Sequence, residues 1–189
     1  MKPVLNWKIL CVALAALLLF QPLSIADEAQ LSNIVVTNNR DDLLLYVNAS
    51  GAFKEKTKKA ILSGVPTTFS YYIMLNSSRS YWLNKKIVDI KVTHSIEYDN
   101  LKKEFRVIRS WDAGGPAVTR SFEEAQQLMV QIDSLKIASL DRLEKGRRYQ
   151  IRAKAELSKF TLPLHLHRIF FFLAYWDYET DWYTIDFTF

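Results

Sequence analysis

Polar and apolar side chains alternate along much of this chain with a period of two residues. That period is typical of β-strands with one packed face and one wet face. The alternation is most regular over residues 148–157, where odd positions are apolar and even positions are charged or polar. Further β-rich runs cover residues 31–38, 42–49, 67–75, 89–98, 101–111, 134–140 and 182–189.

Two segments change to helical spacing. Residues 53–63 gather their apolar side chains on one face, and the following Gly64 is a typical helix C-cap. A second helix is predicted to begin at Ser121, whose spacing from Glu124 matches a capping box, and its apolar stripe continues to Ile132. The pattern therefore predicts a mainly β (α+β) fold: an antiparallel β-sandwich or curled sheet of about seven or eight strands with two short helices.

The N-terminal residues have the three zones of a secretory signal peptide. Two lysines precede an uncharged apolar run over 9–20, and small residues lead to Ala26. The run is shorter than the roughly twenty residues that a membrane-spanning helix needs. We therefore expect residues 1–26 to be a cleaved signal peptide and residues 27–189 to form a single β-rich exported domain in the periplasm. The alternative is an uncleaved N-terminal anchor.

Composition narrows the chemistry of the exported domain. Cys11 is the only cysteine and lies within the predicted signal peptide, so the exported domain has no disulfide, thiolate nucleophile or cysteine metal site. Loss of Lys2 and Lys8 lowers the formal net charge from +5 to +3. This modest charge, together with export, argues against nucleic acid as a partner.

Histidines offer a candidate metal site. His165 and His167 are two residues apart, so on a strand they would point the same way and could share a metal ion. A site needs a third ligand, and the remaining histidine, His94, lies on the apolar face of its predicted strand. We therefore predict no metal and no other cofactor, with a metal-dependent envelope enzyme as the third-ranked function.

Acidic residues near the C-terminus offer a candidate for acid–base catalysis. Asp177, Glu179 and Asp181 cluster in a turn-like stretch between aromatic segments, where carboxylates more often simply solvate a loop. No Gly-x-Ser-x-Gly elbow or phosphate-binding glycine loop occurs in the sequence. We therefore predict a protein that is not an enzyme.

The C-terminal region carries more aromatic side chains than a sheet with only one buried face needs. Such a surplus either fills the core or lines an exposed apolar groove, and the core is the favoured interpretation. The candidate binding residues are Phe170, Phe172, Tyr175, Trp176 and Trp182.

The final strand supports an alternative from another class. Residues 183–189 alternate in polarity and end on Phe189, which resembles the last strand of bacterial outer-membrane barrels. A small outer-membrane β-barrel is therefore the second-ranked hypothesis. Three features argue against a barrel. Two helices would interrupt the succession of hairpins, and His94 would face lipid. The run over 169–176 is continuously apolar, whereas the strands of a barrel wall have a polar inner face.

Several segments together resemble a family of small exported bacterial proteins catalogued only as a domain of unknown function. The matching pieces are residues 60–69, 96–101, 143–149 and 162–183, which contain turns, caps and core positions but no catalytic motif. The resemblance implies export, a β-rich fold and envelope sensing alongside membrane sensor kinases. We accordingly expect a non-enzymatic periplasmic binding or accessory protein whose partner is an envelope protein, such as a membrane sensor kinase, with membrane association not favoured.

Overall fold

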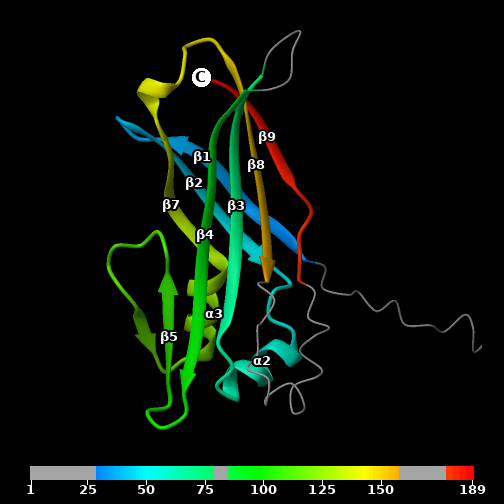
Figure 1. Ribbon diagram of the computed structural model, residues 1–189, viewed down its shortest axis with the longest axis vertical. Helices are drawn as coiled ribbons and strands as arrows, with labels where there is room; N and C mark the ends of the chain where they lie inside the picture. Colours follow the sequence, from blue (N-terminus) through cyan, green and yellow to red (C-terminus); the bar gives the residue numbers. More distant parts are fainter. Residues whose placement is uncertain (1–28, 79–84, 158–177) are drawn as a thin grey trace, which may run out of the picture.

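The computed structural model of the protein describes residues 29–78, 85–157 and 178–189. In these residues the strands form two antiparallel sheets (Figure 1). The small sheet has three strands in the order β1-β2-β7, and the large sheet has six in the order β6-β5-β4-β3-β8-β9. The strands are β1 (Gln30–Asn38), β2 (Asp42–Ser50), β3 (Thr67–Ser77), β4 (Lys85–Asp99), β5 (Glu104–Arg109), β6 (Ala117–Thr119), β7 (Gln131–Ser139), β8 (Arg148–Leu157) and β9 (Tyr183–Thr188).

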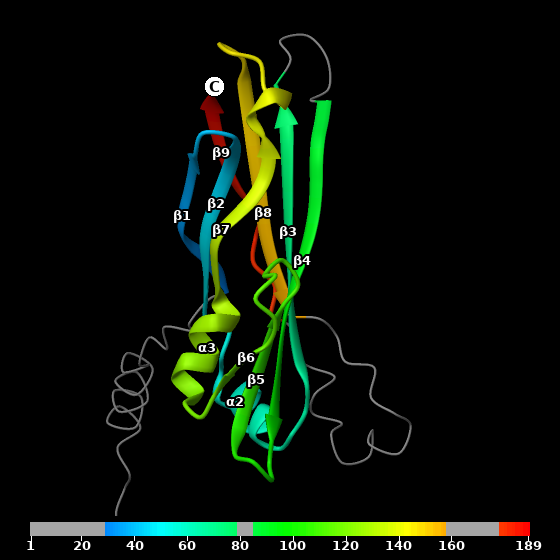
Figure 2. The same cartoon turned by 90° about the vertical axis from the view of Figure 1, so that its left-hand side faces the viewer.

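The small sheet and the helices share the inner face of the large sheet. Seen from the side, the small sheet packs against one half of the large sheet, while α2 (Glu55–Leu62) and α3 (Phe122–Val130) lie toward the other end (Figure 2). A short 3-10 helix, η1 (Leu140–Arg142), follows β7. The predicted α+β class, with an antiparallel sandwich and two short helices, is confirmed.

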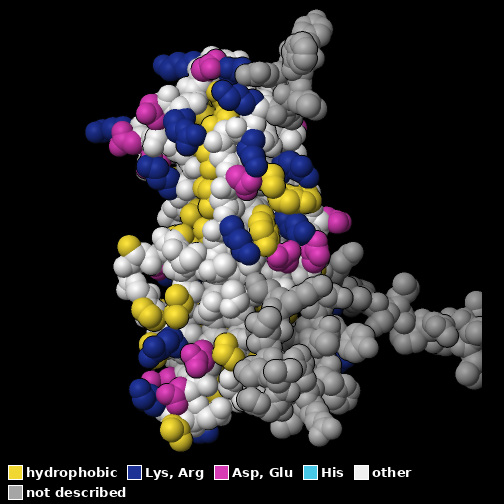
Figure 3. Space-filling model, viewed as in Figure 1, with side chains coloured by type: hydrophobic (Ala, Val, Ile, Leu, Met, Phe, Trp, Pro, Cys, Tyr) yellow, Lys and Arg dark blue, Asp and Glu magenta, His cyan; other side chains and the backbone are white. Residues whose placement is uncertain are grey.

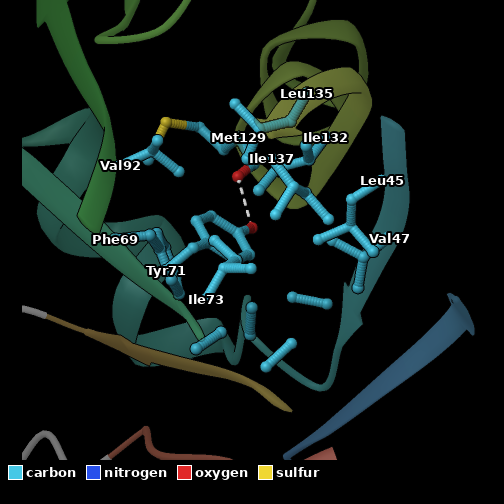
Figure 4. Packing of buried hydrophobic residues seen from close by; sticks show 14 of the residues in the cluster. Leu45, Val47, Phe69, Tyr71, Ile73, Val92, Met129, Ile132, Leu135 and Ile137 are labelled. Atoms are coloured by element: carbon cyan, nitrogen blue, oxygen red, sulfur yellow. Dashed lines mark hydrogen bonds between the residues drawn. The ribbon is translucent and has the colours of Figure 1, made fainter. Parts of the chain in front are cut away.

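Alternating side chains explain which face of each strand is buried. The odd positions of β3 and β8 point into the sandwich, as the two-residue period predicted, and Tyr71, Ile73 and Ile151 are each about 1% exposed. The core also takes side chains from the small sheet and from α3 (Figure 4). Its labelled members are Leu45, Val47, Phe69, Tyr71, Ile73, Val92, Met129, Ile132, Leu135 and Ile137.

Both helices end or begin near the predicted caps. Gly64 has φ +81°, and its N–H donates to the Ile61 carbonyl at 2.8 Å, as a glycine cap requires. Ser121 Oγ accepts from Glu124 N–H at 3.2 Å, which is half of a capping box. The other half is absent because the Ser121 N–H donates to Thr119 Oγ1 instead, at 3.1 Å.

The hairpin between β4 and β5 has a longer loop than the sequence predicted. Asp99 pairs with Glu104, so the returning strand begins at Glu104 rather than at Leu101. The Asp99 carboxylate accepts from the N–H groups of Leu101 and Lys102 at 2.9 and 3.0 Å, which holds these residues in a turn. Asp99 therefore folds the loop back on itself before the ladder can start.

Other boundaries also differ from the sequence prediction, and β4 begins at Lys85 rather than at Asp89. The apolar stripe of the second helix was expected to reach Ile132, but α3 ends at Val130 and β7 begins at Gln131. Ile132 is fully buried on β7. The prediction placed it on the helix because an apolar residue at this position fits both a helical stripe and the first inward position of a strand. The three-residue strand β6 was not predicted, since three residues are too few to show a period.

Aromatic rings fill the core at the helical end of the sandwich. The Phe53 ring is tilted against that of Phe69, with 5.5 Å between ring centroids, and the Phe122 centroid lies 6.0 Å from that of Phe53 and 5.7 Å from that of Phe105. Tyr178 closes the group, 5.4 Å from Phe69. Within the described ranges, no helix has the length and apolar character needed to cross a membrane.

Candidate binding face

The outer face of the large sheet carries a row of alternating aromatic and cationic side chains. Tyr72 on β3 pairs with Lys91 on β4 and with Lys154 on β8. On the far side of β8, Arg152 pairs with Thr184, so continuing that antiparallel register places Trp182 opposite Lys154. We call Trp182, Lys154, Tyr72 and Lys91 the cation–aromatic row.

Each cation of the row lies over an aromatic face. Lys91 Nζ is 5.0 Å from the centroid of the Tyr72 ring, and Lys154 Nζ is 5.8 Å from that of Trp182. The Arg152 guanidinium, one diagonal step away, lies 4.8 Å from the Trp182 ring. These distances are within the range of cation–π attraction. Figure 3 looks onto this face of the large sheet and shows charged and apolar side chains intermixed on it.

Carboxylates hold Lys154 and Tyr72 of the row in place. Lys154 forms ion pairs with Glu179 and, at 3.8 Å, with Glu156. The hydrogen bond to Glu179 is the largest of the causes that raise the pKa of Lys154, so the ammonium stays charged. The Tyr72 hydroxyl donates to Glu156 Oε1 at 2.6 Å. The centre of the row, Lys154 and Tyr72, is therefore held in one arrangement before any ligand arrives.

A small cavity adjoins the row at Trp182. Its volume is about 270 Å³, and it lies between the start of β1 and the segment that leads into β9. The lining residues are Ala29, Gln30, Leu31, Thr180, Asp181, Trp182 and Tyr183. Trp182 thus borders both the outer face and this cavity.

The predicted binding residues divide into two groups. Trp182 lies in the row, half-buried and stacked beneath two cations. The other four candidates, Phe170, Phe172, Tyr175 and Trp176, lie outside the described residues. Sequence reasoning missed Tyr72, Lys91, Arg152 and Lys154. The alternation in 148–157 marks Arg152 and Lys154 as outward-facing, but it contains no signal that brings them to Trp182.

The predicted metal and acid–base candidates are placed in part. His94 is fully buried, as its apolar face suggested, and both ring nitrogens have hydrogen-bond partners, Met129 O and Trp111 Nε1. In the part of the chain that the structure describes, no three His, Cys, Asp or Glu side chains are grouped as a metal site would require. His165 and His167 lie outside that part.

The carboxylates weighed as acid catalysts do not form a pair in the described residues. Glu179 is bound to Lys154, and Asp181 is exposed at the mouth of the cavity. Asp177 lies outside the described residues. Glu179 therefore acts as a positioning partner for the row.

Comparison with known proteins identifies the family. The model of the family described as "Domain of unknown function (DUF4390)" matches residues 26–186, and the chain belongs to this family. Neither a curated protein nor a solved structure matches the chain.

Proposed function

We propose that this member of an uncharacterised family is a non-enzymatic binding or accessory protein that recognises a protein partner through the cation–aromatic row. The observation that carries the proposal is the row itself: two aromatic rings and two cations lie side by side across β4, β3, β8 and the segment that leads into β9. Trp182 and Tyr72 of the row, and Arg152 beside it, belong to the residue types that contribute most to protein–protein interfaces. A flat, preorganised arrangement of this kind favours a protein surface over a small ligand.

The contacts of the row also support a binding role rather than catalysis. Lys154 and Glu156 bind each other and their neighbours, and the Lys154 side chain is only 16% exposed. A general base or nucleophile needs a free, accessible group beside a site for substrate. These side chains instead use their hydrogen-bonding capacity to hold aromatic faces in position.

The proposed location is the periplasm, after removal of residues 1–26. The signal-like pattern of the N-terminus supports this location, and the family match begins at residue 26, beside the predicted cleavage site. The resemblance to exported proteins implies an envelope partner, such as a membrane sensor kinase. Sensing would then consist of a change in how strongly the row binds that partner.

Site-specific crosslinking in intact cells tests the binding proposal. A photoreactive residue at Thr184, next to the row, should give a discrete adduct with one envelope protein. Trp182→Ala should reduce the adduct at least tenfold. Ile108→Ala is the matched control, because Ile108 is also apolar and exposed (47%) but lies on β5. Equal adduct yields from both variants would contradict a role for the row.

Fractionation tests the proposed location. We expect the protein to leave the cell on osmotic shock and its mass to correspond to a chain that begins at Asp27. An uncleaved anchor would instead give a chain starting at Met1 that stays with the inner membrane. An outer-membrane barrel would remain in the outer membrane after carbonate washing and change its gel mobility on boiling.

A further inference from the structure

Part of one edge of β4 has no neighbouring strand among the described residues. β4 pairs with β3 along nearly its whole length, whereas β5 covers only the stretch from His94 to Asp99. Ser110, just after β5, binds the next residue of β4: its N–H donates to Thr93 O and its Oγ accepts from Thr93 N–H, both at 2.8 Å. Arg142 Nη2 donates to Ile87 O at 3.0 Å. Among the described strands, none pairs with residues 88–92 on this side.

Backbone groups point out of this gap. Because both backbone groups of Thr93 face the β5 side, the two-residue period of a strand turns those of Lys91 and Asp89 the same way. No described residue donates to or accepts from these groups of Lys91 and Asp89. Two N–H donors and two carbonyl acceptors therefore lie in line, about 7 Å from one pair to the next.

Apolar side chains beside the gap are incompletely covered. Ile87, Val88 and Ile90 pack against the core, yet each stays only half-buried. β7, the strand opposite them, belongs to the small sheet and cannot supply a ladder to β4. An added strand would place alternate side chains over this apolar strip, and burial of apolar area would then stabilise the pairing.

We propose that an extended, acidic segment of the partner protein adds to the large sheet at the β4 edge, pairing with residues 88–92. This inference rests on the proposed function, since it assumes a protein partner, but it names a second contact region and its chemistry. Main-chain hydrogen bonds supply affinity in this mode of recognition, and alternate side chains supply specificity.

Charge around the gap selects an acidic segment. Lys85, Lys86, Lys91 and Arg142 surround the free edge, and all are exposed. Lys86 and Asp89, the acidic residue of the stretch, neutralise each other through an ion pair at 2.7 Å, which leaves Lys85, Lys91 and Arg142 as the cations that favour an acidic segment. Lysines on an edge also discourage strands of like charge from pairing there.

A second copy of this chain fits the edge less well. An antiparallel copy paired through Asp89 and Lys91 would bring its own β5 against Lys86, because β5 occupies the same edge of β4 as the gap. The free stretch is therefore suited to a short segment with no neighbour of its own.

A peptide titration tests the inference. The probe is a capped heptapeptide of alternating glutamate and valine, added to isotopically labelled full-length protein and followed by NMR. We expect the amides of Asp89 and Lys91 to shift and to gain protection from hydrogen exchange. N-methylation of one alternate set of probe amides should weaken binding at least tenfold, while methylation of the other set should not. Equal binding of both methylated probes, or no binding at millimolar concentration, would overturn the inference.

A pair of variants tests the same edge from the protein side. Lys91→Pro removes an edge-facing N–H without removing a hydrogen bond to β3, so it should weaken probe binding at least tenfold. Lys91→Ala, the matched control, removes the same charge but retains the N–H, so the loss of binding in Lys91→Pro beyond that in Lys91→Ala measures the backbone hydrogen bond. If Lys91→Pro does not fold, the two methylated probes are sufficient to support or overturn strand addition.

The remaining outcomes separate this inference from the proposed function. Shifts confined to the residues around Trp182 would overturn strand addition at β4 and leave the cation–aromatic row as the contact. Protection of the Asp89 and Lys91 amides before any probe is added, with a doubled molecular mass, would overturn the inference in favour of a second copy.

Discussion

The indole N–H of Trp111 donates to Nε2 of His94, with 2.7 Å between the two nitrogens. The other ring nitrogen, Nδ1, lies 2.9 Å from the Met129 carbonyl and can only donate to it. Nε2 must therefore be unprotonated, and the buried imidazole is neutral. His94 joins the loop after β5 to the end of α3.

Acid should destabilise the protein through His94. Burial, aided by the charge of Arg109, lowers the pKa of His94 from 6.5 to about 4, against the opposing effect of the Met129 carbonyl. Between these two values the unfolded chain binds a proton that the folded chain does not, so stability falls as pH drops through this window. The loss should reach about 3 kcal/mol near pH 4, measured as the free energy of unfolding in urea.

A substitution of His94 tests how much of this dependence of stability on pH is due to the histidine. His94→Gln should be less stable at pH 7 and should lose most of the dependence on pH between 6.5 and 4 that the parent shows. An undiminished slope in the variant would assign the effect to other groups.

Neighbouring tyrosines on β3 should differ in their contribution to stability. The Tyr71 hydroxyl donates to Met129 O at 2.9 Å within the core (Figure 4), and burial raises the pKa of Tyr71 so that it remains a donor. Tyr71→Phe should cost about 1 kcal/mol. Tyr72→Phe also loses a hydrogen bond, but its acceptor Glu156 is partly exposed and water can replace the hydroxyl, so the cost should be smaller than that of Tyr71→Phe. Denaturant midpoints measure both, and a larger loss for Tyr72→Phe would contradict this ranking.

A charge on the packed face of β8 should prevent stable folding. Ile151 is 1% exposed, and Ile151→Asp would bury an unpaired carboxylate, with an expected cost of about 3 kcal/mol or more. Arg148→Asp, on the exposed side of the same strand, should change stability by less than about 0.5 kcal/mol. Similar melting temperatures for the two variants would contradict the packing.

Removing the paired histidines should leave metal content unchanged. The double variant His165→Ala with His167→Ala should match the parent in bound zinc, which we expect to be well below one ion per chain, and in melting temperature. Elemental analysis of dialysed protein measures the first quantity. Stoichiometric zinc in the parent that disappears from the variant would support the metal-dependent enzyme instead.

Strand faces could be predicted from the sequence because they depend on local geometry. In 148–157, successive side chains must point to opposite sides, so apolar odd positions such as Ile151 reveal the packed face without knowledge of any neighbour. The glycine cap at Gly64 and the serine cap at Ser121 are similarly local. The end of α3 was misplaced because Ile132 satisfies both a helical stripe and a strand.

The candidate site could not be predicted in this way, because it depends on which strands become neighbours. Tyr72 meets Lys154 only because β8 inserts beside β3, and Trp182 meets Lys154 only through the register of β9. Likewise, among the described strands the edge of β4 is open over 88–92 because β5 stops at Arg109, short of its partner's full length. The sequence by itself determined the faces of the strands, the local caps and the fold class. Only the tertiary structure decided which faces share a row and which edge stays open, because both depend on hydrogen-bonded pairing between segments distant in the chain.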